Sequence, residues 1–445
     1  MRVPLAALLV GLAACTGGRG TAVPTTPGDP TTTTVSTTSV PPVRTGVGVQ
    51  DGTIRLGVLA AITGPIPDIG QSVLNGHEVW WAYVNEELGG VGGRYPVELV
   101  IEDNQYNPEI NVTAYNEIKD GVLGFSSTLG TPTTASIQQD AAAESILVAA
   151  GSMASFWSQT QNVVLNLASN TYLAQFANGP YWAMEVADPP LMTAETPVGV
   201  ISQADDYGQD CLKGYELALQ NLGFQDASRQ TYQPTDEDFS AQMSAFQAAG
   251  VEVVFVCALP SALARMIGTN DVLGYRPVIF GSSPTYHVVL PTILGGGGGE
   301  QAGLPAFANY YQLGTGPAFE EETPGMELLR RNLETYGAEV PPASVNTFYF
   351  FGYTQAQTFH TILERALERG DLTREGLLTA LNEVQGVDLG YGLGEAGFGA
   401  SVTQRVPTDI DAVGRPVSTS QSRFGLERVS DFFVAPYLED YDYGR

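Results

Sequence analysis

The chain has 445 residues, of which 43% are hydrophobic, so it holds enough apolar sequence for sizeable cores and favours two domains. Its formal net charge is −28, with 20 lysines and arginines against 48 aspartates and glutamates. Because proteins bind nucleic-acid phosphates with clustered lysine and arginine, this balance argues against a nucleic-acid partner.

The N-terminus has the pattern of an export signal. Met1 and Arg2 precede an apolar run at 3–14, which is too short to cross a bilayer as a helix. The run ends in Leu-Ala-Ala-Cys, which resembles the lipobox of bacterial lipoproteins, where the cysteine is acylated and becomes the new N-terminus. We therefore expect a signal peptide at 1–15 and a lipid anchor on Cys15, at the outer face of the cell membrane. An ordinary secretory signal with a chance cysteine is the alternative.

The segment after the cysteine has the composition of a tether. Residues 16–50 are rich in threonine, serine and proline, and such a sequence cannot bury enough apolar surface to fold. No later segment is apolar enough to cross a membrane, so the lipid alone would hold the protein there. An exported location permits a disulfide between Cys211 and Cys257, while two buried free thiols are the alternative.

Strand and helix patterns alternate from residue 54 onward. Near-continuous apolar runs, typical of strands buried on both faces, occupy 54–62, 97–103, 121–125, 146–150, 197–202, 251–256 and 277–280. Helical patterns separate many of these runs, and two more follow at 344–368 and 373–383. The alternation predicts two α/β domains with parallel sheets, the second inserted between parts of the first. We place the first at 51–170 plus 306–400, and the second with the hinge return at 171–305 plus 401–445.

Signatures of catalysis are scarce. The three histidines do not form a zinc-binding pair on a helix, and Cys-x-x-Cys and Gly-x-Ser-x-Gly motifs are absent. One Gly-x-Gly-x-x-Gly match at 392–397 lacks the strand before it and the helix after it that a dinucleotide site needs. We therefore expect no covalent chemistry, no metal and no cofactor.

Two polar clusters follow predicted strands. The stretch 124–136 is rich in serine and threonine, with Thr131 as a candidate N-cap and Pro132 as the first helical residue, an arrangement that favours a carboxylate. In the other domain, acidic and tyrosine side chains at 205–210 and 235–240 would suit an ammonium group. Plain helix capping explains either cluster alone, but the two together fit a zwitterionic amino acid in a cleft.

The folded region resembles the substrate-binding proteins of ABC importers, of the branched-chain amino-acid (Leu/Ile/Val-binding) type. The resemblance runs from about residue 54 to residue 436 and depends on the order of several short motifs. These are GVLAAITGP at 57–65, Asn75-Gly76, NEELGGVGGR at 85–94, VELVIED at 97–103, DYG at 206–208, DFS at 238–240 and GYTQA at 352–356. It implies the type I periplasmic binding protein fold, in which two doubly wound lobes joined by three crossings close on a ligand.

The resemblance also implies the ligand-binding residues. Serine and threonine loops that hold the ligand carboxylate match Ser126, Ser127 and Thr128, then Gly151, Ser152 and Met153. Met153 departs from the family, which often has threonine there, and the usual proline nearby is missing. The ammonium contacts match Tyr207 and Asp236, the latter shorter than the glutamate of Leu/Ile/Val binders, and the side-chain end matches Ile69, Phe125 and Tyr353.

The sequence thus predicts a monomeric, lipid-anchored extracytoplasmic binding protein that delivers a small solute, an amino acid above all, to an ABC permease. A ligand-sensing component with the same fold is one alternative, and an enzyme is a more remote one. Amides, urea-like solutes and small carboxylates are the alternative ligands.

Overall fold

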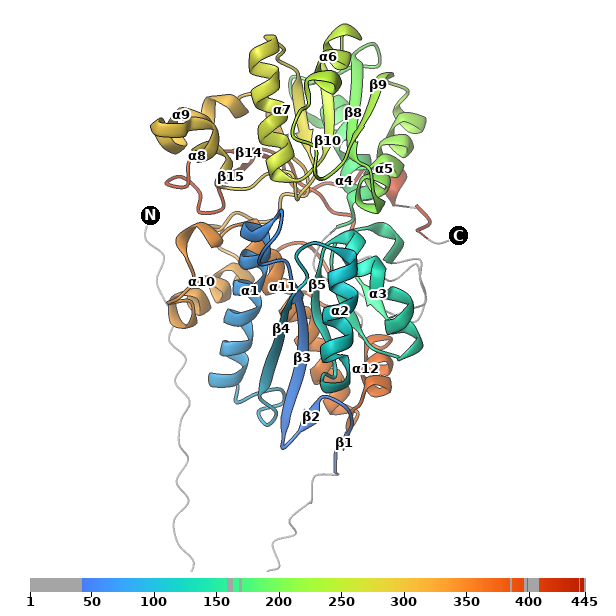
Figure 1. Ribbon diagram of the computed structural model, residues 1–445, viewed down its shortest axis with the longest axis vertical. Helices are drawn as coiled ribbons and strands as arrows, with labels where there is room; N and C mark the ends of the chain where they lie inside the picture. Colours follow the sequence, from blue (N-terminus) through green and yellow to red (C-terminus); the bar gives the residue numbers. More distant parts are fainter. Residues whose placement is uncertain are drawn as a thin grey trace, which may run out of the picture. The chain divides into compact units, whose positions relative to one another are not determined.

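The computed structural model describes residues 42–157, 163–167, 170–384, 386–395, 398, 408–439 and 441–443. The predicted signal peptide, Cys15 and most of the predicted tether lie outside the described residues. The described chain forms two large sheets with helices packed against them, besides a small two-stranded sheet, and we call each large sheet with its helices a lobe (Figure 1).

The first lobe contains a six-stranded sheet. Its strands are β2 (Val49–Gln50), β3 (Thr53–Ala60), β4 (Val97–Asp103), β5 (Gly124–Leu129), β6 (Val148–Gly151) and β7 (Val164–Leu165). The parallel strands lie in the order β4-β3-β5-β6-β7, and β2 pairs antiparallel with one end of β3. All four apolar runs predicted in the first domain correspond to strands. The third strand was expected at 121–125 but lies at 124–129.

The second lobe contains a seven-stranded sheet. Its strands are β8 (Pro197–Gln203), β9 (Gln225–Tyr232), β10 (Val253–Cys257), β11 (Val278–Gly281), β12 (Tyr310–Gln312), β14 (Gly414–Pro416) and β15 (Leu426–Arg428). They lie in the order β9-β8-β10-β11-β12-β14-β15, and all neighbours pair parallel except that β14 pairs antiparallel with both β12 and β15. When the parallel strands of each lobe are numbered along the chain, both sheets have the order second, first, third, fourth, fifth. Both are therefore doubly wound, with a switch point between the first and third of these strands.

Helices cover both sheets. The first lobe has α1 (Pro67–Glu86), α2 (Pro108–Ile118), α3 (Thr131–Ala143), α10 (Pro324–Tyr336), α11 (Thr347–Glu368) and α12 (Arg374–Leu381). The second has α4 (Tyr172–Tyr181), α5 (Asp206–Leu222), α6 (Ser240–Ala248), α7 (Pro260–Leu273), α8 (Leu290–Gly295) and α9 (Gly299–Gly303). The α3 helix begins at Thr131 with Gly130 as its N-cap, so the cap lies one residue before the predicted one.

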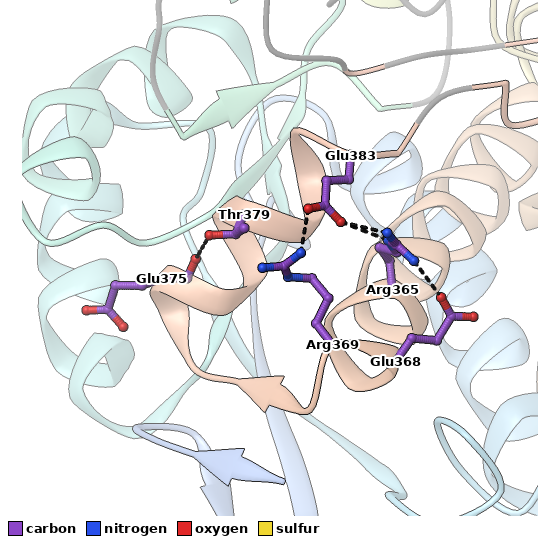
Figure 2. Close-up of polar contacts among 6 residues, drawn as sticks. All are labelled: Arg365, Glu368, Arg369, Glu375, Thr379 and Glu383. Atoms are coloured by element: carbon purple, nitrogen blue, oxygen red, sulfur yellow. Dashed lines mark hydrogen bonds and ion pairs between the residues drawn. The ribbon is translucent and has the colours of Figure 1, made fainter.

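Close helix contacts and ion pairs hold the first lobe together. Helices α1 and α11 cross so closely that a Cβ atom on Gly352 would lie 2.1 Å from the Val73 carbonyl oxygen. At the end of α11, Arg365 and Arg369 both pair with Glu383, which follows α12 (Figure 2). These contacts fix α12 against the helix that carries part of the cavity wall described below.

The structure corrects two predicted boundaries. Strand β12 lies beside β11 in the second sheet, so the return to the first lobe comes after Gln312 and not at residue 306. The folded region also begins before residue 51, because β1 (Arg44–Thr45) pairs with β13 (Asp371–Leu372). Arg44 strengthens this pairing with a 3.2 Å ion pair to Asp371, a contact that the composition of the tether did not reveal.

The two cysteines of the second lobe are bonded to each other. Cys211 on α5 and Cys257 at the end of β10 form a disulfide, which decides between the two alternatives that the sequence left open. Among the described residues, no helix is long and apolar enough to cross a membrane.

Candidate functional site

Loops that follow strands of both sheets line one large cavity. From the first lobe, Ile66 follows β3 and Tyr106 follows β4, Leu129 ends β5 and is followed by Gly130 and Thr131, and Gly151 ends β6 and is followed by Met153. From the second lobe, Tyr207 follows β8, Leu259 follows β10, Ser283 and Pro284 follow β11, and Gln312 ends β12 and is followed by residues 314–318. The cavity therefore lies at the carboxyl ends of the parallel strands, where open α/β sheets bind their ligands.

The cavity is mostly apolar. Its empty space is about 1330 Å³, including the part open to solvent. Helix α11 contributes Phe348, Phe350 and Phe351, and the return segment contributes Phe424 and Leu426. Such a wall buries an apolar ligand body, while polar groups that interrupt it would fix the orientation of the ligand.

Four of the predicted site residues line this cavity. They are Ile69, Gly151, Met153 and Tyr207. The Tyr207 hydroxyl is 2.6 Å from Ser282 Oγ and donates to the Ala258 carbonyl oxygen at 3.2 Å, so it is engaged within the second lobe. Met153 places its sulfur 3.3 Å from Ser283 Oγ and gives the cavity a polarizable apolar surface where the family often has threonine.

The predicted hydroxyl cluster lies inside the sheet. Ser126, Ser127 and Thr128 are buried in β5 between β3 and β6, and their hydroxyls have no hydrogen-bond partner among the described residues. The strand continues to Leu129, and the chain turns only at Gly130, where φ is 109°. The loop that reaches the cavity is therefore Gly130-Thr131, a few residues later than predicted.

Ser152 and the two aromatic candidates, Phe125 and Tyr353, do not line the cavity either. Ser152 is buried next to the wall, where its Oγ is 2.8 Å from Thr131 Oγ1, and Thr131 does line the cavity. Phe125 stacks on Tyr115 in the core. The Tyr353 hydroxyl accepts a 2.8 Å hydrogen bond from Asn332 Nδ2 on α10.

Asp236, the predicted ammonium partner, has a local structural role. Its Oδ2 accepts a 2.8 Å hydrogen bond from the backbone N–H of Gln233, which stabilises the turn before α6. Asp236 is not among the cavity-lining residues. The acidic run at 235–240 therefore serves the start of a helix, which was the alternative explanation from the sequence.

Tyr106, Asp411 and Arg428 are among the polar side chains of the wall that the sequence did not single out. Gln105 and Tyr106 adopt positive φ values of 53° and 55°, which are unfavourable for residues with side chains, and the side chains of Asp103 and Asn104 hold them there. Tyr106 lies just after the predicted strand at 97–103, so its place at the end of a strand could have marked it as a candidate site residue.

Asp411 and Arg428 had no comparable signal, because β14 and β15 beside them are short antiparallel strands with little apolar pattern. Burial raises the pKa of Asp411 to about 7, and backbone N–H donors oppose that rise. Arg428 pairs with Glu321 at 2.9 Å. The described residues contain no cluster of histidine, cysteine, aspartate and glutamate that could hold a metal ion.

Comparison with known families identifies this architecture. The model of a family described as periplasmic binding protein matches residues 53–411, which is most of the chain. The chain belongs to the periplasmic binding protein family. Within this family the resemblance to Leu/Ile/Val-type binding proteins is confirmed, as is the fold of two doubly wound α/β lobes.

Periplasmic binding proteins similar to this chain carry names with different ligands. A fatty acid ABC transporter substrate-binding protein from Thermomonospora curvata has a TM-score of 0.79 and 25% identity, over 90% of this chain and 97% of that one. A branched chain amino acid ABC transporter protein from Thermus thermophilus, with bound valine, has a TM-score of 0.73 and 20% identity, over 89% of this chain and all of that one.

A curated relative also shares part of the sequence. It is Leu/Ile/Val-binding protein homolog 3 from Brucella melitensis, which is 27% identical over 203 residues, or 45% of this chain. The match spans about half of that relative, 53% of its length.

Proposed function

We propose that this protein captures a small ligand with an extended apolar body between its two lobes and delivers it to an ABC importer, without chemical turnover. The observation that carries this proposal is the apolar and aromatic wall of the cavity at the carboxyl ends of both sheets. An amino acid with a large apolar side chain fits this wall, as does a longer aliphatic ligand. The names of the two structural relatives, one for fatty acids and one with valine, support a ligand with an apolar body.

Contacts between the lobes would hold the ligand-bound form closed. His287 of the second lobe stacks on Phe348 of the first at 5.6 Å, and its Nε2 lies 3.2 Å from Asn346 Nδ2. Burial lowers the pKa of His287 to about 4, so the ring is neutral at physiological pH. A ligand that touches both lobes would shift the population towards the closed form, because it gains those contacts only there.

The test is a thermal-shift and calorimetry screen of the chain from residue 16 onward, after unfolding and refolding to remove carried-over ligand. The ligands are amino acids, aliphatic acids and amines, and amides. A ligand at 100 times its dissociation constant stabilises the protein by about 2.7 kcal/mol. No stabilisation by any ligand with an apolar body would refute the proposal.

A pair of variants locates the binding in this cavity. Phe350→Ala removes part of the apolar wall, and burying roughly 40–80 Å² less apolar surface weakens an apolar ligand by about 1–2 kcal/mol, or about 5–30-fold. Val272→Ala on α7 is the matched control, because Val272 is 88% exposed and does not line the cavity. Equal loss of affinity in both variants would place the ligand elsewhere.

We also propose that Cys15 carries a lipid anchor and that the protein acts as a monomer. The apolar run at 3–14 that ends at this cysteine supports the anchor. The full chain should partition into the detergent phase of a Triton X-114 separation, and Cys15→Ser should move it to the aqueous phase. An unchanged partition of the variant would refute lipidation, and a dimer in analytical ultracentrifugation would refute the monomer.

A further inference from the structure

One buried carboxylate in the cavity wall is half satisfied. Asp411 is 2% exposed and lies in the segment through which the chain returns to the second lobe. Its Oδ1 accepts hydrogen bonds from the backbone N–H groups of Gly314 and Ala412, both at 2.7 Å. These two donors fix the orientation of the carboxylate, because both belong to the backbone.

The other oxygen has no partner. Asp411 Oδ2 is buried and makes no hydrogen bond among the described residues. Asn170 acts as a side-chain donor that lowers the pKa of Asp411, but its Nδ2 does not reach hydrogen-bond geometry with Oδ2 and donates to the Ile410 carbonyl oxygen at 3.0 Å. A buried carboxylate oxygen without a donor is costly, and native proteins retain such groups mainly where a ligand or a reaction uses them.

No cation of the described chain neutralises this carboxylate. Arg428, the only arginine or lysine among the described cavity-lining residues, pairs with Glu321 at 2.9 Å. Asp409, on the same segment, accepts a hydrogen bond from the Tyr443 hydroxyl and does not line the cavity. The remaining ionisable groups of the wall are tyrosines whose pKa values burial raises above the ordinary range, namely Tyr106, Tyr172 and Tyr207.

We propose that Asp411 is the polar anchor of the cavity, and that the ligand presents a protonated amine on an apolar body to Asp411 Oδ2. This inference deepens the proposed function and rests on it. An ammonium group supplies both the missing hydrogen-bond donor and the missing positive charge, and a charge-assisted hydrogen bond is the strong kind. A simple carboxylic acid would instead place a second negative charge beside Asp411, unless Asp411 were protonated.

The two possibilities predict opposite pH dependences. Burial raises the pKa of Asp411 to about 7. An amine ligand needs the ionised carboxylate, so its affinity should rise from pH 5.5 to pH 7 and level off above it. An acid that binds a protonated Asp411 should lose affinity over the same range. The three wall tyrosines named above stay neutral between pH 5.5 and pH 8.5, because burial raises their pKa values.

Calorimetry with matched ligands tests the proposal. The ligands are phenylalanine, phenethylamine and 3-phenylpropionate, with octylamine and octanoate as an aliphatic pair. We expect the amine-bearing ligands to bind, and Asp411→Asn to weaken them tenfold or more and to remove their pH dependence. The variant keeps an oxygen for the two backbone donors. Asp409→Asn, the matched control, should leave the affinities unchanged.

The outcomes separate this inference from the proposed function. Binding of the acids without the amines, or equal amine affinities in Asp411→Asn and the wild type, would overturn the role of Asp411 and leave an apolar-ligand binder. A loss of amine affinity in Asp409→Asn equal to that in Asp411→Asn would also overturn it. If none of the five ligands and none of the wider screen binds, the proposed function fails, and this inference fails with it.

Discussion

The crossing of α1 and α11 gives a sharp prediction for a single methyl group. In Gly352→Ala, the new Cβ would lie 2.1 Å from the Val73 carbonyl oxygen and 2.8 Å from its carbonyl carbon. Both atoms are backbone, so a side-chain rotation cannot relieve the contact. The helices must separate by roughly 1 Å, which loses dispersion contacts along their whole interface.

The expected loss can be bounded. Overpacking of this kind costs about 1–3 kcal/mol, and we take the upper end because the obstacle is backbone. Alanine in place of glycine within a helix returns about 1 kcal/mol. The free energy of unfolding should therefore fall by about 2 kcal/mol. For a lobe of about 200 residues, with an unfolding entropy of about 0.4 kcal/mol/K, this lowers the melting temperature by about 5 °C.

Gly268→Ala is the matched control. Gly268 also lies inside a helix, α7, but a Cβ atom there would meet no other atom within 4 Å. Only the helix-propensity term remains, so this variant should be more stable than the wild type by about 0.5–1 kcal/mol. Urea unfolding followed by circular dichroism measures both variants. An unfolding midpoint of Gly352→Ala at or above that of the wild type would refute the steric argument.

Three further predictions concern buried groups. Tyr207→Phe removes a hydroxyl bonded to Ser282, so the free energy of unfolding should fall by about 1 kcal/mol. Calorimetry should find the ligand affinity within threefold of the wild type, and a tenfold loss would show that the hydroxyl contacts the ligand. Burial raises the pKa of Asp210 to about 6, so the folded state binds the proton more tightly than the unfolded state. The stability of the wild type relative to Asp210→Asn should therefore fall by about 2–3 kcal/mol as pH rises from 4 to 7. A difference in unfolding free energy that does not change with pH in urea titrations would contradict this. Replacing Cys211 and Cys257 by alanine opens a loop of 46 residues, and the added chain entropy of the unfolded state should lower stability by about 4 kcal/mol. An unchanged midpoint of urea unfolding would contradict the disulfide.

The fold was largely predictable because buried parallel strands leave continuous apolar runs. The runs at 97–103 and 197–202 match β4 and β8 almost residue for residue. The strand β9 was missed because it lies at the edge of the second sheet, where its polar sequence QDASRQTY faces solvent along most of its length. The strands β14 and β15 have three residues each, too short for a period to show.

The site was less predictable because its residues come from segments without a common pattern. The expectation that ligand contacts follow the strands was sound, and it located Gly151, Met153 and Tyr207 at the cavity. It placed the hydroxyl cluster too early, because small hydroxyl side chains are tolerated inside β5 and gave no signal of where the strand ends. Asp411 is far from any strand that the sequence showed, and only the fold brings it to the wall.

The motifs that carried the family resemblance explain why the fold was easier to predict than the site. Gly76 and Gly352 form the close helix crossing, and a Cβ atom on Gly208 would lie 1.9 Å from the Gln203 carbonyl oxygen, so this glycine sets the start of α5 against β8. Asp238 accepts a 2.9 Å hydrogen bond from the backbone N–H of Ser240 and so begins α6. These residues specify the scaffold and are not among the cavity-lining residues. A chain can therefore keep the motifs of Leu/Ile/Val binders while a different residue anchors the ligand, the role we propose for Asp411, and its ligand has to be inferred from the wall of its own cavity.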